Sequence, residues 1–162
     1  MVFTYTDKQL NELNQGKNVY SSNPEYAERK GYKIVTPSPK NKGETNTIIS
    51  DGQEFRVVAT KSDTETGFDG LAVAPIVNGK PDYKNVAVIA AGTDPDSPVN
   101  KSMFVSRDVN SAIIAKKMYL SSQYKVADQF VKEIMDDPRY EVSQLSGYSQ
   151  GSYMLKIGAK YH

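Results

Sequence analysis

The sequence predicts an α/β fold, in which helices flank a mixed sheet and a short helical extension precedes it. Three observations support this. Segments between residues 47 and 91 have the composition of strands, and apolar residues between 109 and 134 recur at helical spacing. A further strand and helix follow at residues 140–160. A strand, a crossover helix and a second strand form the unit that gives a parallel pair.

Composition narrows the class of protein. The 162 residues are enough for one domain with a sizeable core, and the apolar fraction of 38% with 24% charged residues is typical of a globular protein. The net charge of +1 indicates neither a nucleic-acid partner nor an anionic membrane. We expect no transmembrane segment and no secretory signal. The compartment stays open between the cytoplasm and export by a signal-independent route.

Cysteine and histidine counts restrict the chemistry. The chain has no cysteine and one histidine, so we expect no disulfide, no thiol nucleophile, no metal site and no cofactor. Asp94, Asp96 and Asp108 lack the spacing of a calcium loop, and loop solvation explains them better.

The N-terminal extension, residues 1–46, begins with two helical signals. Thr6 and Gln9 form a capping box for a first helix. Asn23-Pro24 starts a second helix, which Gly31 ends. After residues 33–36, residues 37–46 are rich in proline, lysine, asparagine and glycine, which predicts an exposed loop.

Four strands follow in the region that we assign to the main domain, residues 47–162. They are expected at Thr47–Ser50, Glu54–Thr60, Leu71–Val77 and Val86–Ala91. Asp51-Gly52 is a two-residue hairpin turn, and the last two strands are joined through Asn78-Gly79 and Pro81. The last strand is continuously apolar, which is typical of a strand covered on both faces.

The last third of the chain predicts helix, strand and helix. Helical spacing relates Val109, Ala112, Ile113 and Lys116, and again Ala127, Phe130, Val131 and Ile134. Ser121 or Ser122 is the expected cap of the second stripe, and Asp137-Pro138 ends it. A strand at Tyr140–Ser146, parallel to Val86–Ala91, and a helix at Ser152–Lys160 complete the prediction.

Between that last strand and helix lies Gly147-Tyr148-Ser149-Gln150-Gly151, a G-x-S-x-G pentapeptide. Chance produces this pattern in a chain of this length with odds of about one in twenty. Its position indicates a nucleophile elbow, a strained strand-to-helix turn that exposes a serine hydroxyl and needs small flanking residues. The alternative is a serine cap after a glycine turn.

At this point the sequence resembles the class 3 lipase-like branch of the α/β-hydrolase superfamily. The resemblance rests on VAVIAAGTD (Val86–Asp94), Asp108 and LSGYSQG (Leu145–Gly151), and it covers roughly residue 54 to the C-terminus. It implies that residues 47–162 are the N-terminal part of a hydrolase domain. Two positions differ from the family: Tyr148 replaces a histidine, and Gln150 replaces a leucine before Gly151.

The resemblance also implies roles for individual residues. Ser149 is the implied nucleophile, in an elbow formed by Gly147, Tyr148 and Gly151. The amide or hydroxyl of Thr93 and the amide of Gln150 are the implied oxyanion-hole donors. The implied activity is acyl transfer from carboxylic esters, including lipid esters, through a seryl-ester intermediate. For Gly92-Thr93 the alternative is a simple strand-exit turn.

The remaining triad residues have no candidate. No aspartate or glutamate follows Ser149, and His162 is thirteen residues away. Along a continuous helix this is roughly 20 Å, whereas hydrogen-bond reach is about 3 Å. We therefore expect little or no turnover from this chain alone.

Three interpretations remain open. The chain is the truncated N-terminal part of a longer hydrolase, a non-catalytic interaction protein on a hydrolase-like scaffold, or an unrelated α/β domain with a chance pentapeptide. In the first case the nucleophile strand is an uncovered, apolar sheet edge, which predicts self-association.

Overall fold

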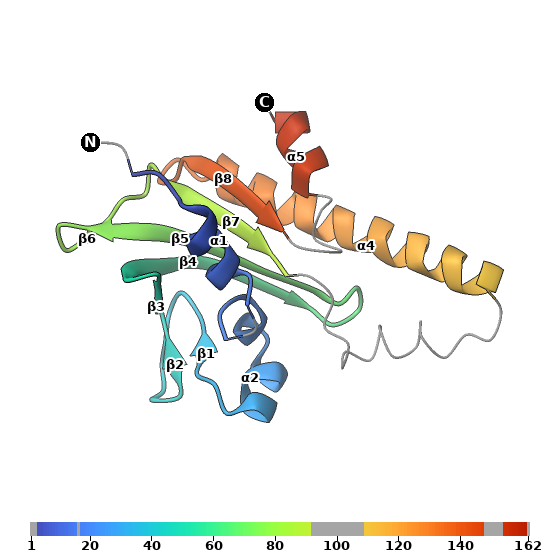
Figure 1. Cartoon of the computed structure of the whole chain (residues 1–162), viewed down its shortest axis with the longest axis horizontal. Helices are drawn as coiled ribbons and strands as arrows, with labels where there is room; N and C mark the ends of the chain where they lie inside the picture. The colour runs from blue at the N-terminus through green and yellow to red at the C-terminus, as the bar shows by residue number, and fades with distance from the viewer. Residues whose placement is uncertain (1–2, 16, 92–108, 148–153, 162) are drawn as a thin grey trace.

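The computed structural model describes residues 3–15, 17–91, 109–147 and 154–161, with only the backbone described for 109–120 (Figure 1). The N-terminal part contains three short helices and a two-stranded parallel sheet. The helices are α1 (Asp7–Leu13), the 3-10 helix η1 (Val19–Ser22) and α2 (Pro24–Lys30), and the strands are β1 (Ile34–Val35) and β2 (Glu44–Thr45). The predicted loop at residues 37–46 therefore ends in a short strand.

The main sheet has the order β3-β4-β5-β7-β8, with β6 pairing β5 to one side. Its strands are β3 (Thr47–Ser50), β4 (Gln53–Asp63), β5 (Phe68–Val77), β6 (Lys80–Pro81), β7 (Val86–Ala90) and β8 (Val142–Gly147). The pairs β3·β4, β4·β5 and β5·β7 are antiparallel, whereas the pair β7·β8 is parallel. The helices α4 (Val109–Asp136) and α5 (Met154–Tyr161) complete the described fold, so the predicted mixed α/β content is confirmed.

Local sequence signals set several of these boundaries. Both hydrogen bonds of the capping box between Thr6 and Gln9 are present, and the Asn23 side chain caps the N-terminus of α2, as predicted. Gly31 ends α2 with a φ of 70°. Asp51 and Asn78, with the glycine after each, also have positive φ, which is the conformation that a tight hairpin turn requires.

The prediction of a helix start at Ser121 or Ser122 is wrong. α4 is one continuous helix of 28 residues, and both serines are exposed positions inside it. An exposed serine costs a helix little, because its hydroxyl can be solvated instead of competing for the backbone. The helix ends at Asp136, directly before Asp137-Pro138, as expected.

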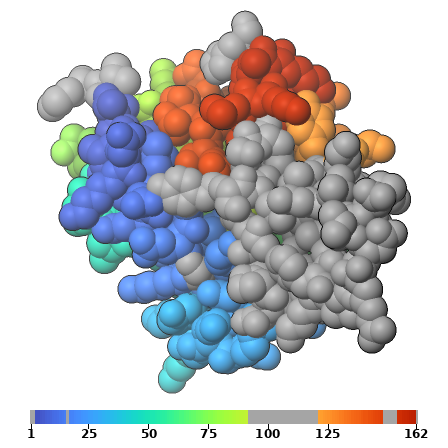
Figure 2. Space-filling model, turned by 45° about the vertical axis from the view of Figure 1, so that its right-hand side comes forward, coloured from blue at the N-terminus to red at the C-terminus, as the bar shows by residue number. Residues whose placement is uncertain are grey.

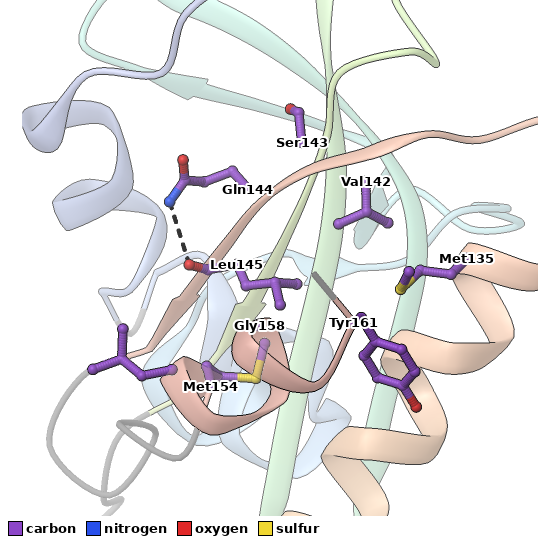
Figure 3. A pocket seen from close by; sticks show the side chains of 9 residues that line it. Met135, Val142, Ser143, Gln144, Leu145, Met154, Gly158 and Tyr161 are labelled. Atoms are coloured by element: carbon purple, nitrogen blue, oxygen red, sulfur yellow. Dashed lines mark hydrogen bonds between the residues drawn. The ribbon is translucent and has the colours of Figure 1, made fainter.

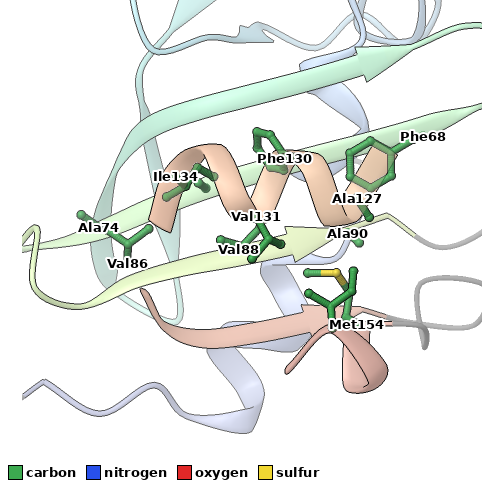
Figure 4. Packing of buried hydrophobic residues seen from close by; sticks show 12 residues of the cluster. Phe68, Ala74, Val86, Val88, Ala90, Ala127, Phe130, Val131, Ile134 and Met154 are labelled. Atoms are coloured by element: carbon green, nitrogen blue, oxygen red, sulfur yellow. The ribbon is translucent and has the colours of Figure 1, made fainter. Parts of the chain in front are cut away.

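Hydrophobic residues cover both faces of the sheet. On one face α4 and α5 pack against alternate residues of β7, Val86, Val88 and Ala90 (Figure 4). On the other face Ala87 and Ile89 join a second cluster, to which the N-terminal extension contributes Leu13, Val19 and Val35. All five β7 residues are fully buried, so the prediction of a strand covered on both faces is confirmed.

Candidate site at the ends of β7 and β8

The ends of the two parallel strands lie side by side. Ala90, the last residue of β7, is in register with Gly147, the last residue of β8. The loops after both strands therefore start at the same end of the sheet, the carboxyl end of these parallel strands, which is where α/β folds bind their ligands. The predicted parallel pairing is confirmed, and α4 is its crossover helix.

Gly147 is the only residue of the pentapeptide within the described structure. Tyr148, Ser149, Gln150 and Gly151 lie outside the described residues, as do Gly92-Thr93, the three loop aspartates and His162. The implied roles of these residues therefore stay predictions. What the structure describes is the frame on either side: a strand that ends at Gly147 and a helix that begins at Met154.

The helix after the pentapeptide is held on the sheet by two buried side chains. Met154 and Ile157, one turn apart in α5, belong to the same hydrophobic cluster as the α4 residues Ala127 and Val131. Figure 4 shows Met154 beside the end of β7. Because Met154 is the first residue of α5, this contact fixes where the helix begins relative to both strands.

A polar network fixes the other end of α5. Asp128 of α4 accepts hydrogen bonds from Lys160 Nζ at 2.9 Å and from the Tyr161 hydroxyl at 2.8 Å. Burial acts to raise the pKa of Asp128, but these two hydrogen bonds outweigh it and leave the pKa below its ordinary value. The same interaction raises the pKa of Lys160. Sequence reasoning missed this network because its members are 32 and 33 residues apart.

The N-terminal extension contacts β8 just before the pentapeptide. Asn14, at the C-terminal cap of α1, donates through Nδ2 to the Leu10 carbonyl at 2.8 Å and to Ser146 Oγ at 3.1 Å. The Asn14 side chain is buried, yet its Oδ1 has no hydrogen-bond partner among the described residues. The sequence carried no signal for this contact between residues 132 positions apart.

A groove of about 320 Å³ runs beside β8 (Figure 3). It is lined by β8, by α5 and by Met135 near the end of α4, and two of its apolar side chains are exposed: Met135 at 39% and Leu155 at 79%. Within the described chain no strand pairs with the outer side of β8. β8 is therefore an edge strand of the described sheet, and its sequence VSQLSG is only partly apolar, which corrects the expectation of an apolar edge.

Some backbone groups of β8 face away from β7, toward the side where no described strand pairs with it. The backbone groups of β7 alternate between its two neighbouring strands. Those of odd-numbered residues face β5, since the Ala91 N–H donates to the Asp69 carbonyl. Those of even-numbered residues face β8, since the Val86 N–H donates to the Glu141 carbonyl. The register shifts between Val86 and Ala87, so that Val88, which also faces β8, is opposite Leu145, and the Leu145 N–H and carbonyl therefore face away from β7. That carbonyl accepts a 3.3 Å hydrogen bond from Gln144 Nε2, drawn in Figure 3. Self-association through this edge stays a prediction.

Two further searches of the described residues concern metals and membranes. No cluster of three or more histidine, cysteine, aspartate or glutamate side chains is arranged to hold a metal ion there. Among the described helices, none combines the length and apolarity needed to cross a bilayer. In comparisons with known proteins, no family model, no curated protein and no solved structure matches this chain.

Proposed function

We propose that this chain carries the nucleophile-bearing part of a serine ester hydrolase of the lipase or esterase type. In this proposal Ser149 attacks the acyl carbon of a carboxylic ester. The amide of Gln150 and the amide or hydroxyl of Thr93 donate hydrogen bonds to the oxyanion that forms. A seryl ester then replaces the substrate's ester bond, the alcohol leaves, and water releases the acid.

The observation that carries the proposal is the register of Ala90 with Gly147. Thr93 follows β7 by three residues, and Ser149 follows β8 by two. Two loops that start from neighbouring strand ends are short enough to meet, because each residue extends the chain by about 3.5 Å at most. The strand before and the helix after the pentapeptide support the elbow in the same way.

Residues 1–162 offer no general base that could take the proton from the Ser149 hydroxyl. A serine hydroxyl needs a general base, and in this fold the acid and the histidine follow the serine in the sequence. No acidic residue follows Ser149, and His162 is the one histidine. We therefore propose that these residues alone hydrolyse esters slowly or not at all.

A fluorophosphonate probe tests the proposal, because it labels only activated serines. We expect labelling of the protein expressed from its complete reading frame, and loss of labelling in Ser149→Ala. Ser146→Ala is the matched control, since it removes a neighbouring hydroxyl that is not the nucleophile in this proposal. Labelling that survives Ser149→Ala would show that the wrong serine is proposed.

The rival function is a non-catalytic interaction module, and the exposed groove beside β8 is the observation in its favour. A complete reading frame that yields no labelled serine, while the protein is folded by circular dichroism, would favour this rival. The hydrolase proposal would then be abandoned.

A further inference from the structure

The N-terminal extension carries a concentrated positive charge that the net charge of the whole chain hides. Residues 29–42 contain five basic residues and no acidic one: Arg29, Lys30, Lys33, Lys40 and Lys42. All five are exposed. The entire chain has a net charge of only +1, so this segment is far more positive than the rest of the surface.

The fold gathers these residues into one projection, which we call the basic lobe and define as residues 24–45. It comprises α2, β1, β2 and their connections, and it projects away from the main sheet at the bottom of Figure 1. The Ile34 N–H donates to the Gly43 carbonyl at 2.8 Å. This hydrogen bond joins the segment that carries Lys33 to the segment that carries Lys40 and Lys42. In Figure 2 the light-blue residues of the lobe form the lowest part of the molecule.

The lobe also contains three acidic residues, and its five basic residues against these three leave a net charge of +2. Glu44 accepts hydrogen bonds from the backbone N–H groups of Lys40 and Asn41, which lower its pKa and turn the carboxylate into its own loop. On α2, Glu25 and Glu28 are three positions apart and share one face. Arg29 lies four positions after Glu25 and therefore beside it on the helix surface, whereas Lys30 lies four positions after Tyr26.

Tyrosines accompany the basic residues. The Arg29 guanidinium carbon and Lys30 Nζ lie 5.4 Å and 6.0 Å from the centre of the Tyr26 ring. The rings of Tyr20 and Tyr32 lie 5.3 Å and 6.5 Å from the same ring, and Tyr32 is 43% exposed. Exposed tyrosine beside lysine and arginine is the combination found where proteins meet lipid headgroups.

We propose that the basic lobe binds the surface of an anionic lipid bilayer. The four exposed lysines of the lobe attract the headgroup phosphates, and Tyr32 enters the headgroup layer. Single-stranded nucleic acid fits less well, because successive bases need several open aromatic faces to stack on, whereas Tyr32 is the one exposed tyrosine of the lobe. The inference goes beyond the proposed hydrolase and does not rest on it, since lipid binding requires neither Ser149 nor a triad.

Vesicle co-sedimentation tests the proposal. The protein is mixed with vesicles of phosphatidylcholine alone, or with 30% phosphatidylglycerol, at low and high salt. We expect binding to the anionic vesicles only, weakened by salt. Each basic residue near such a surface contributes about a fivefold gain in partitioning, so Lys30→Glu/Lys33→Glu should lose at least about 25-fold. The matched control, Lys80→Glu/Lys84→Glu, makes the same charge change at exposed lysines outside the lobe.

Several outcomes would overturn the proposal. Equal losses in the two double variants would mean that net charge alone drives binding. Equal binding to both kinds of vesicle would exclude the negative headgroup charge as the cause of binding. Displacement by inorganic phosphate at constant ionic strength would indicate a phosphate site, and tighter binding to an oligonucleotide would indicate nucleic acid. Ser149→Ala should bind vesicles like the unmodified protein, so failure of the hydrolase proposal and failure of this one are distinguishable.

Discussion

Replacing Ile157 by alanine tests how the helix after the pentapeptide is seated. Ile157 is fully buried between α5 and the sheet, whereas Leu155, two positions earlier in α5, is 79% exposed. The two side chains have the same number of carbon atoms, so the alanine variants remove equal amounts of apolar material from one helix. Only their orientation differs.

The structure gives the expected size of each effect. Ile157→Ala removes three buried carbons, which at about 0.8 kcal/mol each costs about 2.4 kcal/mol. A residual cavity adds up to about 2 kcal/mol where neighbours do not collapse, and the better helix propensity of alanine returns a few tenths. We expect a loss of about 2–4 kcal/mol in the free energy of unfolding. For Leu155→Ala we expect a change within about 0.5 kcal/mol.

Urea denaturation followed by circular dichroism at 222 nm measures both variants. The free energy of unfolding should separate them by at least about 1.5 kcal/mol, with unchanged slopes. If Leu155→Ala costs as much as Ile157→Ala, or if Ile157→Ala costs less than 1 kcal/mol, α5 is rotated from the described orientation. The frame of the candidate site would then need revision.

Two further predictions use the same measurement. A Cβ at Gly70 would lie 2.7 Å from the buried Phe68 ring, so Gly70→Ala should cost about 1–3 kcal/mol of stability. A Cβ at Gly158 would lie 3.6 Å from Leu145, which is an ordinary contact, so Gly158→Ala should stabilise α5 by about 0.5–1 kcal/mol. Equal effects of the two variants would contradict this packing. Because the pKa of Asp128 is lowered on folding, its contribution is present above the ordinary value of 3.8 and is lost as the pH falls through the lower folded value. The stability advantage over Asp128→Asn should therefore shrink below about pH 4, and a pH-independent difference would refute the assignment.

The sheet was predictable because its signals are local. Turn residues such as Asp51-Gly52 and Asn78-Gly79 need positive φ, and these positions have it. The continuously apolar β7 needs cover on both faces, and α4 and the N-terminal extension provide it. Each of these patterns depends on neighbours within a few residues, so a single sequence is enough to read them.

The full length of α4 was not predictable, because a buried glutamine interrupts its apolar stripe. Gln123 lies on the buried side of the helix, where a polar residue makes the apolar stripe look interrupted. Its Nε2 donates to the Thr66 carbonyl at 3.1 Å, which satisfies the amide in a position otherwise reserved for apolar side chains. This partner lies 57 positions away in the sequence, so no local pattern could reveal it.

The surroundings of the candidate site were partly predictable. The strand before the pentapeptide, its parallel partner and the helix after it follow from periodicity. The contact of Asn14 with Ser146 and the network of Asp128 join distant segments, and polar pairs of this kind have no sequence period. The roles of Thr93, Ser149 and Gln150 stay predictions.

The dimensions of α4 have a mechanical consequence. Its 28 residues extend for about 42 Å, and among the side chains that the structure describes in it, those of residues 121–136, the buried ones run from Gln123 to Ile134, about 17 Å. The helix axis continues for about 20 Å from Gln123 back to Val109, and α4 contacts β5 through its buried part. A tilt of about 10° at that contact would displace Val109 by about 3.5 Å. The direction in which Phe130 and Val131 hold α4 on the sheet therefore matters at its far end, about 30 Å away along the helix axis.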